Sequence, residues 1–161
     1  MLKLSKINEK ISISFNETND CVVRALANGC NMNYRQAHAI LKRKGRKNRK
    51  GTPHRITINV FFQHSKGKIY IPSDYDHILE ISKRSKKYDV KIVDDANKLG
   101  IDMQYEIVPR LLTISQFCRK YNKGRYLVIV RGHALAVVDG VPQDWTSTKS
   151  RHHIGTFFEV K

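Results

Sequence analysis

Hydrophobic positions along the chain change their spacing several times, and each change predicts a new helix or strand. Apolar residues three and four positions apart predict helices over the segments 21–29, 34–44, 53–66, 75–87 and 113–121. Alternating or continuous apolar residues predict strands at 11–15, 68–72, 88–93, 104–108, 126–130, 133–138 and 155–160. Helices thus come first, and we expect an α+β fold of one domain, 1–161, whose antiparallel sheet packs against the helix at 21–29.

The helix at 21–29 begins with a cysteine. Thr18, Asn19 and Asp20 precede it and are good N-cap residues, and capping is the role we expect for Asp20. Gly29 is a natural C-terminal stop. Cys21 therefore lies in the first turn, where the helix dipole and the free backbone N–H groups favour a thiolate. We expect the helix to bury one apolar face, which consists of Val22, Val23, Leu26 and Ala27. We expect the polar residues Arg24 and Asn28 to lie outside.

A short turn signal lies between two segments of strand character near the other end of the chain. Asp139-Gly140 separates the strand at 133–138 from the segment 141–145 and predicts a two-residue hairpin turn. In that register Val138 faces Val141 on the returning strand. The apolar, β-branched run at 126–130 precedes this hairpin and predicts a buried strand.

The hairpin register brings a histidine and an aspartate to one face. Because side chains alternate along a strand, His133 shares its face with Asp144 and Thr146, and Asp144 lies diagonally across from it. Asp139 lies on the opposite face by parity, and only a one-residue bulge would make it the better partner. Trp145 is expected to cover the other side of the strand.

A thiol on a helix tip, a histidine and a carboxylate are the parts of a cysteine nucleophile with its base and orienting residue. His133 would hold the proton of Cys21, and Asp144 would orient the imidazole. Taken singly, each residue has a structural explanation: a small buried thiol, a strand histidine bonded to the backbone, and a strand-end cap. The joint pattern favours catalysis because the base and the carboxylate fall on one face.

Four stretches of the chain together resemble the papain-like cysteine peptidase superfamily, and are most similar to its small members encoded by bacteriophages. They are Asn19–Ala27, Gly45–Thr52, Gly132–Gly140 and Asp144–Trp145. The resemblance covers roughly residues 15–55 and 110–148 and implies a papain-like fold. Other members of the superfamily form or exchange amide bonds, and some have lost activity.

The resemblance implies a role for each candidate site residue. Cys21 would be the nucleophile, His133 the general base and acid, and Asp144 the residue that orients the imidazole. A glutamine before the cysteine often completes the oxyanion hole in this superfamily, but none precedes Cys21 here. Asn16 and Asn19 are the nearby amides, and Asn19 is the candidate second donor beside the N–H of Cys21.

Composition limits the setting in which this chemistry operates. The chain has 161 residues and 40% hydrophobic residues, with no apolar run long enough for a membrane span and no signal-peptide core. Its three cysteines, Cys21, Cys30 and Cys118, have no metal-ligand spacing, so we expect no metal and no cofactor. A reducing cytoplasmic location is the simple interpretation; a bridge between Cys21 and Cys30 is an alternative that would consume the nucleophile.

The net charge of +16 points to an acidic partner. Seven basic residues cluster in one stretch: Lys42, Arg43, Lys44, Arg46, Lys47, Arg49 and Lys50. They predict either a polyanion-binding loop or, with better odds, a solvated loop between helices. In the similar phage proteins such a stretch borders the substrate cleft.

These observations leave more than one function open. The first is a cysteine peptidase or related acyl-transfer enzyme with a peptide or protein substrate, acting in the host cytoplasm or in the virion if phage-encoded. The second is an inactive papain-like scaffold that binds nucleic acid or an acidic host or virion protein. A plain nucleic-acid-binding protein is a third, disfavoured because the sequence has no recognition motif for it. No membrane partner is expected.

Overall fold

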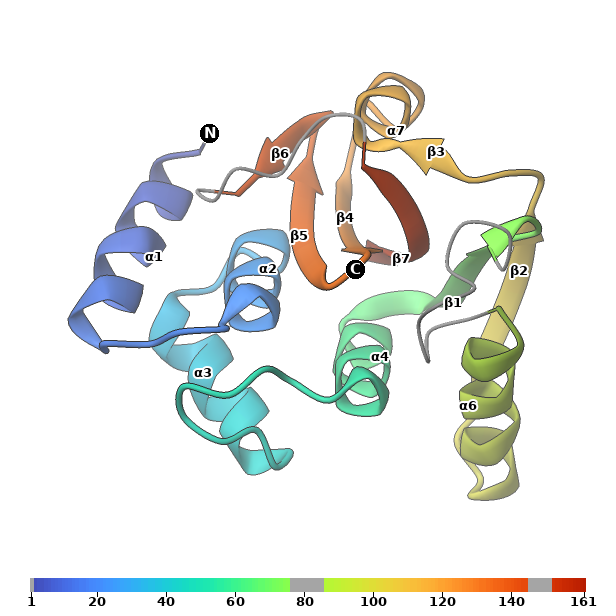
Figure 1. The fold of residues 1–161 in the computed structure, drawn as a ribbon, viewed down its shortest axis with the longest axis horizontal. Coiled ribbons are helices and arrows are strands. Elements are labelled where there is room, and N and C mark those ends of the chain that lie inside the picture. Colours follow the sequence, from blue (N-terminus) through green and yellow to red (C-terminus); the bar gives the residue numbers. More distant parts are fainter. Residues whose placement is uncertain (1, 76–85, 145–151) are drawn as a thin grey trace.

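The computed structural model describes residues 2–75, 86–144 and 152–161, which form a mixed α+β structure (Figure 1). The described helices are α1 (Lys3–Ser14), α2 (Cys21–Gly29), α3 (Tyr34–Arg43), α4 (His54–Gln63), α6 (Lys86–Lys98) and α7 (Ile114–Lys120). The described strands are β1 (Ser65–Pro72), β2 (Gln104–Val108), β3 (Leu112–Thr113), β4 (Arg125–Val130), β5 (His133–Val138), β6 (Val141–Gln143) and β7 (His153–Val160). Most of the helix expected at 75–87, together with Trp145 and Thr146, lies outside the described residues.

The strands form one mostly antiparallel sheet in the order β2-β1-β7-β4-β5-β6, with β3 paired to β7. The C-terminal strand β7 is therefore central. Among the described neighbours, β1 and β2 run parallel and the other pairs run antiparallel. The expectation that the cysteine-bearing helix packs against the sheet is confirmed: α2 lies on β5 and also contacts β4 and β6 (Figure 1).

Hydrophobic side chains fill both sides of the sheet. Leu127 and Ile129 of β4 belong to a core shared with helices α2, α3, α4 and α6. Tyr126 and Val128, which point the other way, belong to a second core with Phe117 of α7. A strand with both faces buried has no need of polar residues, which explains the continuous apolar run at 126–130.

Several helix starts and turns follow the local sequence rules. Asn33 caps α3 and Thr113 caps α7, each as part of a reciprocal capping box. The Asp139-Gly140 turn forms as expected, with φ of 49° at Asp139 and 74° at Gly140. Val138 pairs with Val141 in the predicted register.

The expected edge strand at 11–15 is wrong, because this segment is the end of helix α1. Its alternation of serine and isoleucine fits a helix whose polar side chains face inward. Ser5, Asn8 and Ser12 are buried, three and four positions apart, whereas Ile13 is 71% exposed. Each buried polar group is hydrogen-bonded to another part of the protein, so the usual rule of apolar residues inside does not identify this helix.

The expected strand at 88–93 is also wrong, because the segment lies within helix α6. Its buried residues recur with a helical period: Asp89, Ile92, Val93 and Ala96. The buried aspartate interrupts the apolar pattern and hides that period from sequence analysis. Along the parts of the chain that the structure describes, none of the helices combines the length and apolar character needed to span a lipid bilayer.

Candidate active site

The structure brings together three residues that are far apart in the sequence. Cys21 is the first residue of α2, and His133 is the first residue of β5. Asp144 directly follows β6. Because α2 packs on β5, the thiol and the imidazole line one cleft and lie close enough for each to shift the pKa of the other. The predicted grouping of a helix-tip cysteine with a strand histidine is thus present in the fold.

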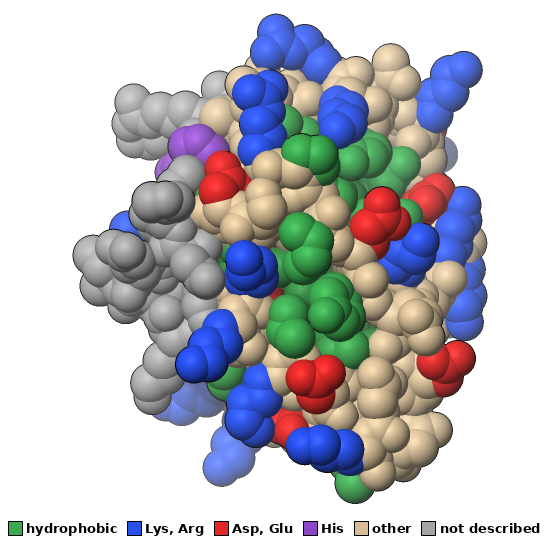
Figure 2. Space-filling model, turned by 90° about the vertical axis from the view of Figure 1, so that its right-hand side faces the viewer, with side chains coloured by type: hydrophobic (Ala, Val, Ile, Leu, Met, Phe, Trp, Pro, Cys, Tyr) green, Lys and Arg blue, Asp and Glu red, His purple; other side chains and the backbone are tan. Residues whose placement is uncertain are grey.

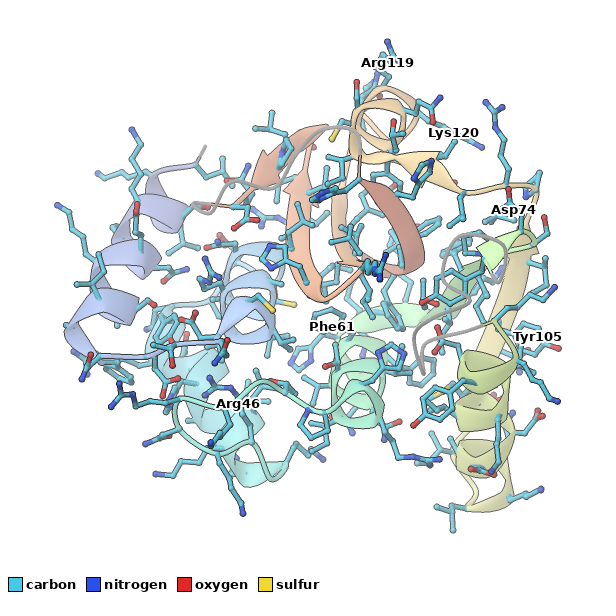
Figure 3. The ribbon with its side chains drawn as sticks, in the orientation of Figure 1. Arg46, Phe61, Asp74, Tyr105, Arg119 and Lys120 are labelled. Atoms are coloured by element: carbon cyan, nitrogen blue, oxygen red, sulfur yellow. The ribbon has the colours of Figure 1, made fainter. Side chains whose placement is uncertain are left out.

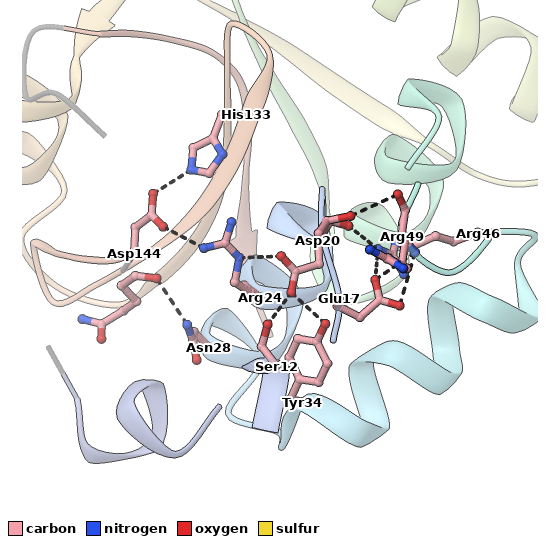
Figure 4. Close-up of polar contacts among 12 residues, drawn as sticks. Ser12, Glu17, Asp20, Arg24, Asn28, Tyr34, Arg46, Arg49, His133 and Asp144 are labelled. Carbon is pink, nitrogen blue, oxygen red and sulfur yellow. Dashed lines mark hydrogen bonds and ion pairs between the residues drawn. The ribbon is translucent and has the colours of Figure 1, made fainter. Parts of the chain in front are cut away.

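The imidazole is held on its other side by the expected aspartate. The Nε2 atom of His133 lies 2.6 Å from Oδ2 of Asp144 (Figure 4). The competing carboxylate, Asp139, accepts a hydrogen bond from the N–H of Gly124 at 2.9 Å instead. The hairpin has no bulge between Val138 and Ala136, so the parity argument that favoured Asp144 holds.

Opposite pKa shifts indicate a thiolate–imidazolium pair. Burial raises the pKa of the Cys21 thiol, but the hydrogen bond and charge of His133, the N–H of Ala134 and the charge of Arg24 outweigh burial, and the pKa falls below the ordinary 9.0. Burial lowers the pKa of His133, but Asp144 and Cys21 raise it to about 9. Between these two pKa values the proton resides on the imidazole, which is the state that a thiol nucleophile needs.

These groups line a cleft of about 120 Å³. Its walls come from the start of α2, the start of α4, the loop before α4 and the turn between β4 and β5. The lining residues are Asn19, Cys21, Val22, Gly51, Thr52, His54, Thr57, Ile129, Gly132, His133 and Ala134. Asn19, the expected second oxyanion donor, is therefore in the cleft, with a left-handed backbone of φ 53°.

A buried charge network continues behind the histidine. Nη1 of Arg24 lies 3.6 Å from Oδ1 of Asp144, and Nε of Arg24 lies 3.1 Å from Oδ1 of Asp20. Oδ2 of Asp20 accepts hydrogen bonds from Ser12 Oγ at 2.6 Å and from Tyr34 OH at 2.7 Å (Figure 4). The network connects α1, α3 and the start of α2 to Asp144. It therefore fixes the position of the carboxylate that binds the imidazole.

Two expectations for α2 are wrong in the light of this network. Asp20 makes no side-chain capping bond, because its carboxylate is bound by Arg24, Ser12 and Tyr34. Arg24 and Asn28 are buried rather than outside, with 8% and 1% of their surface exposed. The helix is enclosed on nearly all sides, so its polar residues are paired inside the protein.

Asn28 also fixes the strand that carries Asp144. Its Nδ2 donates to the backbone oxygen of Gln143 at 3.2 Å (Figure 4), and its Oδ1 accepts a hydrogen bond from Nδ2 of Asn8 at 2.8 Å. The Oε1 of Gln143 accepts from Ser5 Oγ at 2.8 Å. Cys21, Arg24 and Asn28 occupy positions i, i+3 and i+7 of α2, so their shared helix face was a sequence signal that could have revealed this support.

The basic stretch directly precedes two residues of the cleft lining, Gly51 and Thr52, and its members do not act alike. Lys42, Arg43, Lys44, Lys47, Arg49 and Lys50 are exposed. Arg46 is 3% exposed, and its Nη2 lies 2.7 Å from Oε2 of Glu17 beneath the loop (Figures 3 and 4). Its role as a polyanion ligand is therefore wrong: it fixes the loop to the segment that precedes Cys21.

The two other cysteines differ from Cys21. Burial raises the pKa of Cys30 to about 12, and burial also raises the pKa of Cys118. All three thiols are free, so the alternative of a Cys21–Cys30 bridge is wrong. Cys21 is the thiol whose environment favours the anion.

Sequence analysis missed a second histidine–aspartate pair at the same cleft. His54 lies in the helix expected at 53–66, and Asp89 lies in the segment that was expected to be a strand. In the structure Nε2 of His54 lies 2.6 Å from Oδ1 of Asp89, and His54 lines the cleft. These residues are 35 positions apart, and no local pattern pairs them.

Comparison of the chain with protein-family models, with curated proteins and with solved structures finds no match.

Proposed function

We propose that this protein is a thiol-dependent amide hydrolase or acyl-transfer enzyme of the papain-like type. The observation that carries this proposal is the placement of Cys21 beside His133 in one cleft, with His133 bound to Asp144 at 2.6 Å; the pKa of the thiol is lowered and that of the imidazole is raised to about 9. The packing of the cysteine helix against a mostly antiparallel sheet also supports a papain-like arrangement.

The proposed reaction begins when the Sγ thiolate of Cys21 attacks the carbonyl carbon of an amide. A C–S bond forms, and the carbonyl π electrons move to the oxygen. As the C–N bond breaks, Nδ1–H of His133 protonates the leaving amine and a thioester remains. His133 then takes a proton from water or from an acceptor amine, whose lone pair attacks the thioester. The C–S bond breaks, the thiolate returns, and an acid or a new amide leaves.

Stabilisation of the oxyanion is proposed to come from the start of α2. The first N–H groups of a helix have no partner within it, and the N–H of Cys21 is one of them. Asn19 lines the same cleft and carries an amide that can donate a second hydrogen bond. Each such donor contributes roughly 3 kcal/mol to catalysis in well-studied enzymes.

The proposal is tested by labelling the folded protein with iodoacetamide from about pH 5 to about pH 9 and locating the label by mass spectrometry. We expect Cys21 to react first, with an apparent pKa below that of an ordinary thiol. In His133→Ala that pKa should rise, because the imidazolium is lost. Slow labelling of Cys21, or equal rates in the two proteins, would contradict the proposed catalysis.

The charge of the protein supports a second function, binding of a polyanion by an inactive scaffold. Its net charge is +16, and Lys and Arg side chains outnumber acidic ones on the face shown in Figure 2. This function predicts a gel shift with DNA or RNA that weakens with salt and is unchanged in Cys21→Ser. Fast, pH-dependent labelling of Cys21 without such a shift would decide against it.

A further inference from the structure

A second polar wall of the cleft is formed by His54, which comes from α4 and not from the elements that carry Cys21 and His133. His54 Nε2 binds Oδ1 of Asp89 at 2.6 Å, and Oδ2 of Asp89 accepts a hydrogen bond from the hydroxyl of Thr156. Asp89 is fully buried, and the side chain of His54 is nine-tenths buried and stacks on Tyr88. The His54 ring is thus held firmly by groups that belong to α6 and β7.

The charge of this pair follows from its burial. A buried carboxylate needs a counter-charge, and within the described residues the ion-pair partner of Asp89 is His54. When the imidazole is protonated, both of its ring nitrogens carry N–H donors. Nε2 binds Asp89, and Nδ1 has no hydrogen-bond partner among the described residues.

Two polar atoms at this wall have no hydrogen-bond partner. Across the residues that the structure describes, neither Nδ1 of His54 nor Oγ1 of Thr52 has one, although both atoms are shielded from solvent. Both residues line the cleft. Buried polar groups are normally paired, so two unpaired polar atoms on residues that line one cleft point to a missing ligand that forms hydrogen bonds with them.

The backbone around this wall favours an anion. Both α2 and α4 begin at the cleft, and neither helix has a side-chain cap or an acidic residue in its first turn. Their positive ends therefore act together on whatever occupies the cleft. The loop that supplies Gly51 and Thr52 also carries exposed Lys47, Arg49 and Lys50 just before them.

We propose that the Cys21 cleft takes an acidic substrate, whose carboxylate is bound by Nδ1–H of His54 and Oγ1–H of Thr52. The proposal rests on the proposed function, and it names the class of amide that would react: one with a carboxylate close to the scissile bond. The exposed basic side chains of the loop would attract such a substrate from solution.

The test uses two alkylating reagents that differ in charge and need no turnover. Iodoacetate carries a carboxylate where iodoacetamide carries an amide, so the ratio of their rates at Cys21 reports on a carboxylate site. We expect this ratio to exceed that of glutathione by about tenfold, the effect of one charge-assisted hydrogen bond. In His54→Gln the ratio should fall by about tenfold, and a change in the reactivity of the thiol itself cancels because it affects both reagents.

Controls separate folding and surface charge from the His54 site. His64→Gln, at the other end of α4 and outside the cleft lining, should leave the ratio unchanged. Because His54→Gln leaves Asp89 without a counter-charge, the double variant with Asp89→Asn replaces the buried ion pair by neutral groups and should show the same low ratio. The effect should persist in high salt, which screens the exposed loop.

The outcomes are distinct from those of the proposed function. A ratio equal to that of glutathione, or one unchanged in both His54 variants, would overturn the carboxylate site even if Cys21 labels fast with iodoacetamide. Slow labelling with iodoacetamide would refute the proposed catalysis. The ratio of the iodoacetate rate to the iodoacetamide rate would still test the carboxylate site. For an active protein, peptides with Glu or Gln beside the scissile bond, and peptides with a free or amidated C-terminus, identify which carboxylate is bound.

Discussion

Replacement of Asp144 by asparagine isolates the contribution of one carboxylate to the state of the active-site histidine. Asparagine keeps the size and the hydrogen-bonding capacity of the side chain but removes its charge. Because Asp144 raises the pKa of His133 and burial by itself lowers it, we expect this pKa to fall from about 9 towards the ordinary 6.5. The pKa of Cys21 should rise in consequence, since the imidazolium that stabilises the thiolate is lost.

The magnitude follows from the size of the shift. The rise from 6.5 to about 9 corresponds to roughly 3 kcal/mol in favour of the imidazolium. The hydrogen bond that His133 donates to Asp144 is the largest favourable contribution, and the side chain of Asp144 is only 6% exposed, so solvent screens this bond little. We assign it about 2 kcal/mol, which is a change of about 30-fold in the ionisation equilibrium of His133.

The assay is an NMR titration of the His133 ring, combined with the pH dependence of Cys21 alkylation. Asp139→Asn is the matched control, because Asp139 lies in the turn of the same hairpin and binds the N–H of Gly124 instead of the imidazole. Asparagine also tolerates the φ of 49° at that position. A His133 that still titrates near its wild-type pKa in Asp144→Asn, or an equal shift in both variants, would refute the argument.

Three further predictions follow from the same structure. The rate of amide turnover should rise with pH as Cys21 ionises below its ordinary pKa of 9.0 and fall again as His133 loses its proton at about 9, which a kcat/KM profile against pH checks. Cys30 should remain unlabelled by iodoacetamide under conditions that modify Cys21 fully, because burial raises its pKa to about 12; peptide mapping of the labelled protein would contradict this if both sites carried the label. Gly29→Ala should lower the free energy of unfolding by roughly 1–3 kcal/mol, because the added Cβ would lie 2.5 Å from Cδ2 of buried Leu127. Chemical denaturation measures this change, and an unchanged midpoint would show that α2 and β4 are less tightly packed than this contact requires.

Local sequence patterns were sufficient for elements whose stability has a local origin. The helices expected at 34–44 and 113–121 begin next to the capping boxes at Asn33 and Thr113, and the expected Asp139-Gly140 turn has both residues at positive φ. Such features depend on hydrogen bonds and backbone preferences within a few residues. The turn also fixed the strand register, which is why the face shared by His133 and Asp144 could be worked out in advance.

Sequence analysis failed where polar residues are buried. The strands expected at 11–15 and 88–93 lie in helices α1 and α6, because hydrophobic periodicity assumes that polar side chains face water. In the structure their partners come from distant segments: Asn8 binds Asn28, and Asp89 binds His54. No local pattern contains these partners, so neither the helical period nor the buried network could be deduced from it.

The sequence by itself determined the candidate chemistry: a thiol on a helix tip, a histidine on a strand, and a turn that sets the aspartate on the same face. Tertiary structure alone decided that Cys21 and His133 meet, since their contact requires α2 to pack on β5 across more than a hundred residues of chain. It also decided which charges are buried. Arg24, Arg46 and His54 read as ordinary polar residues, but once enclosed in the fold each must be paired, because an isolated buried charge loses its hydration without compensation.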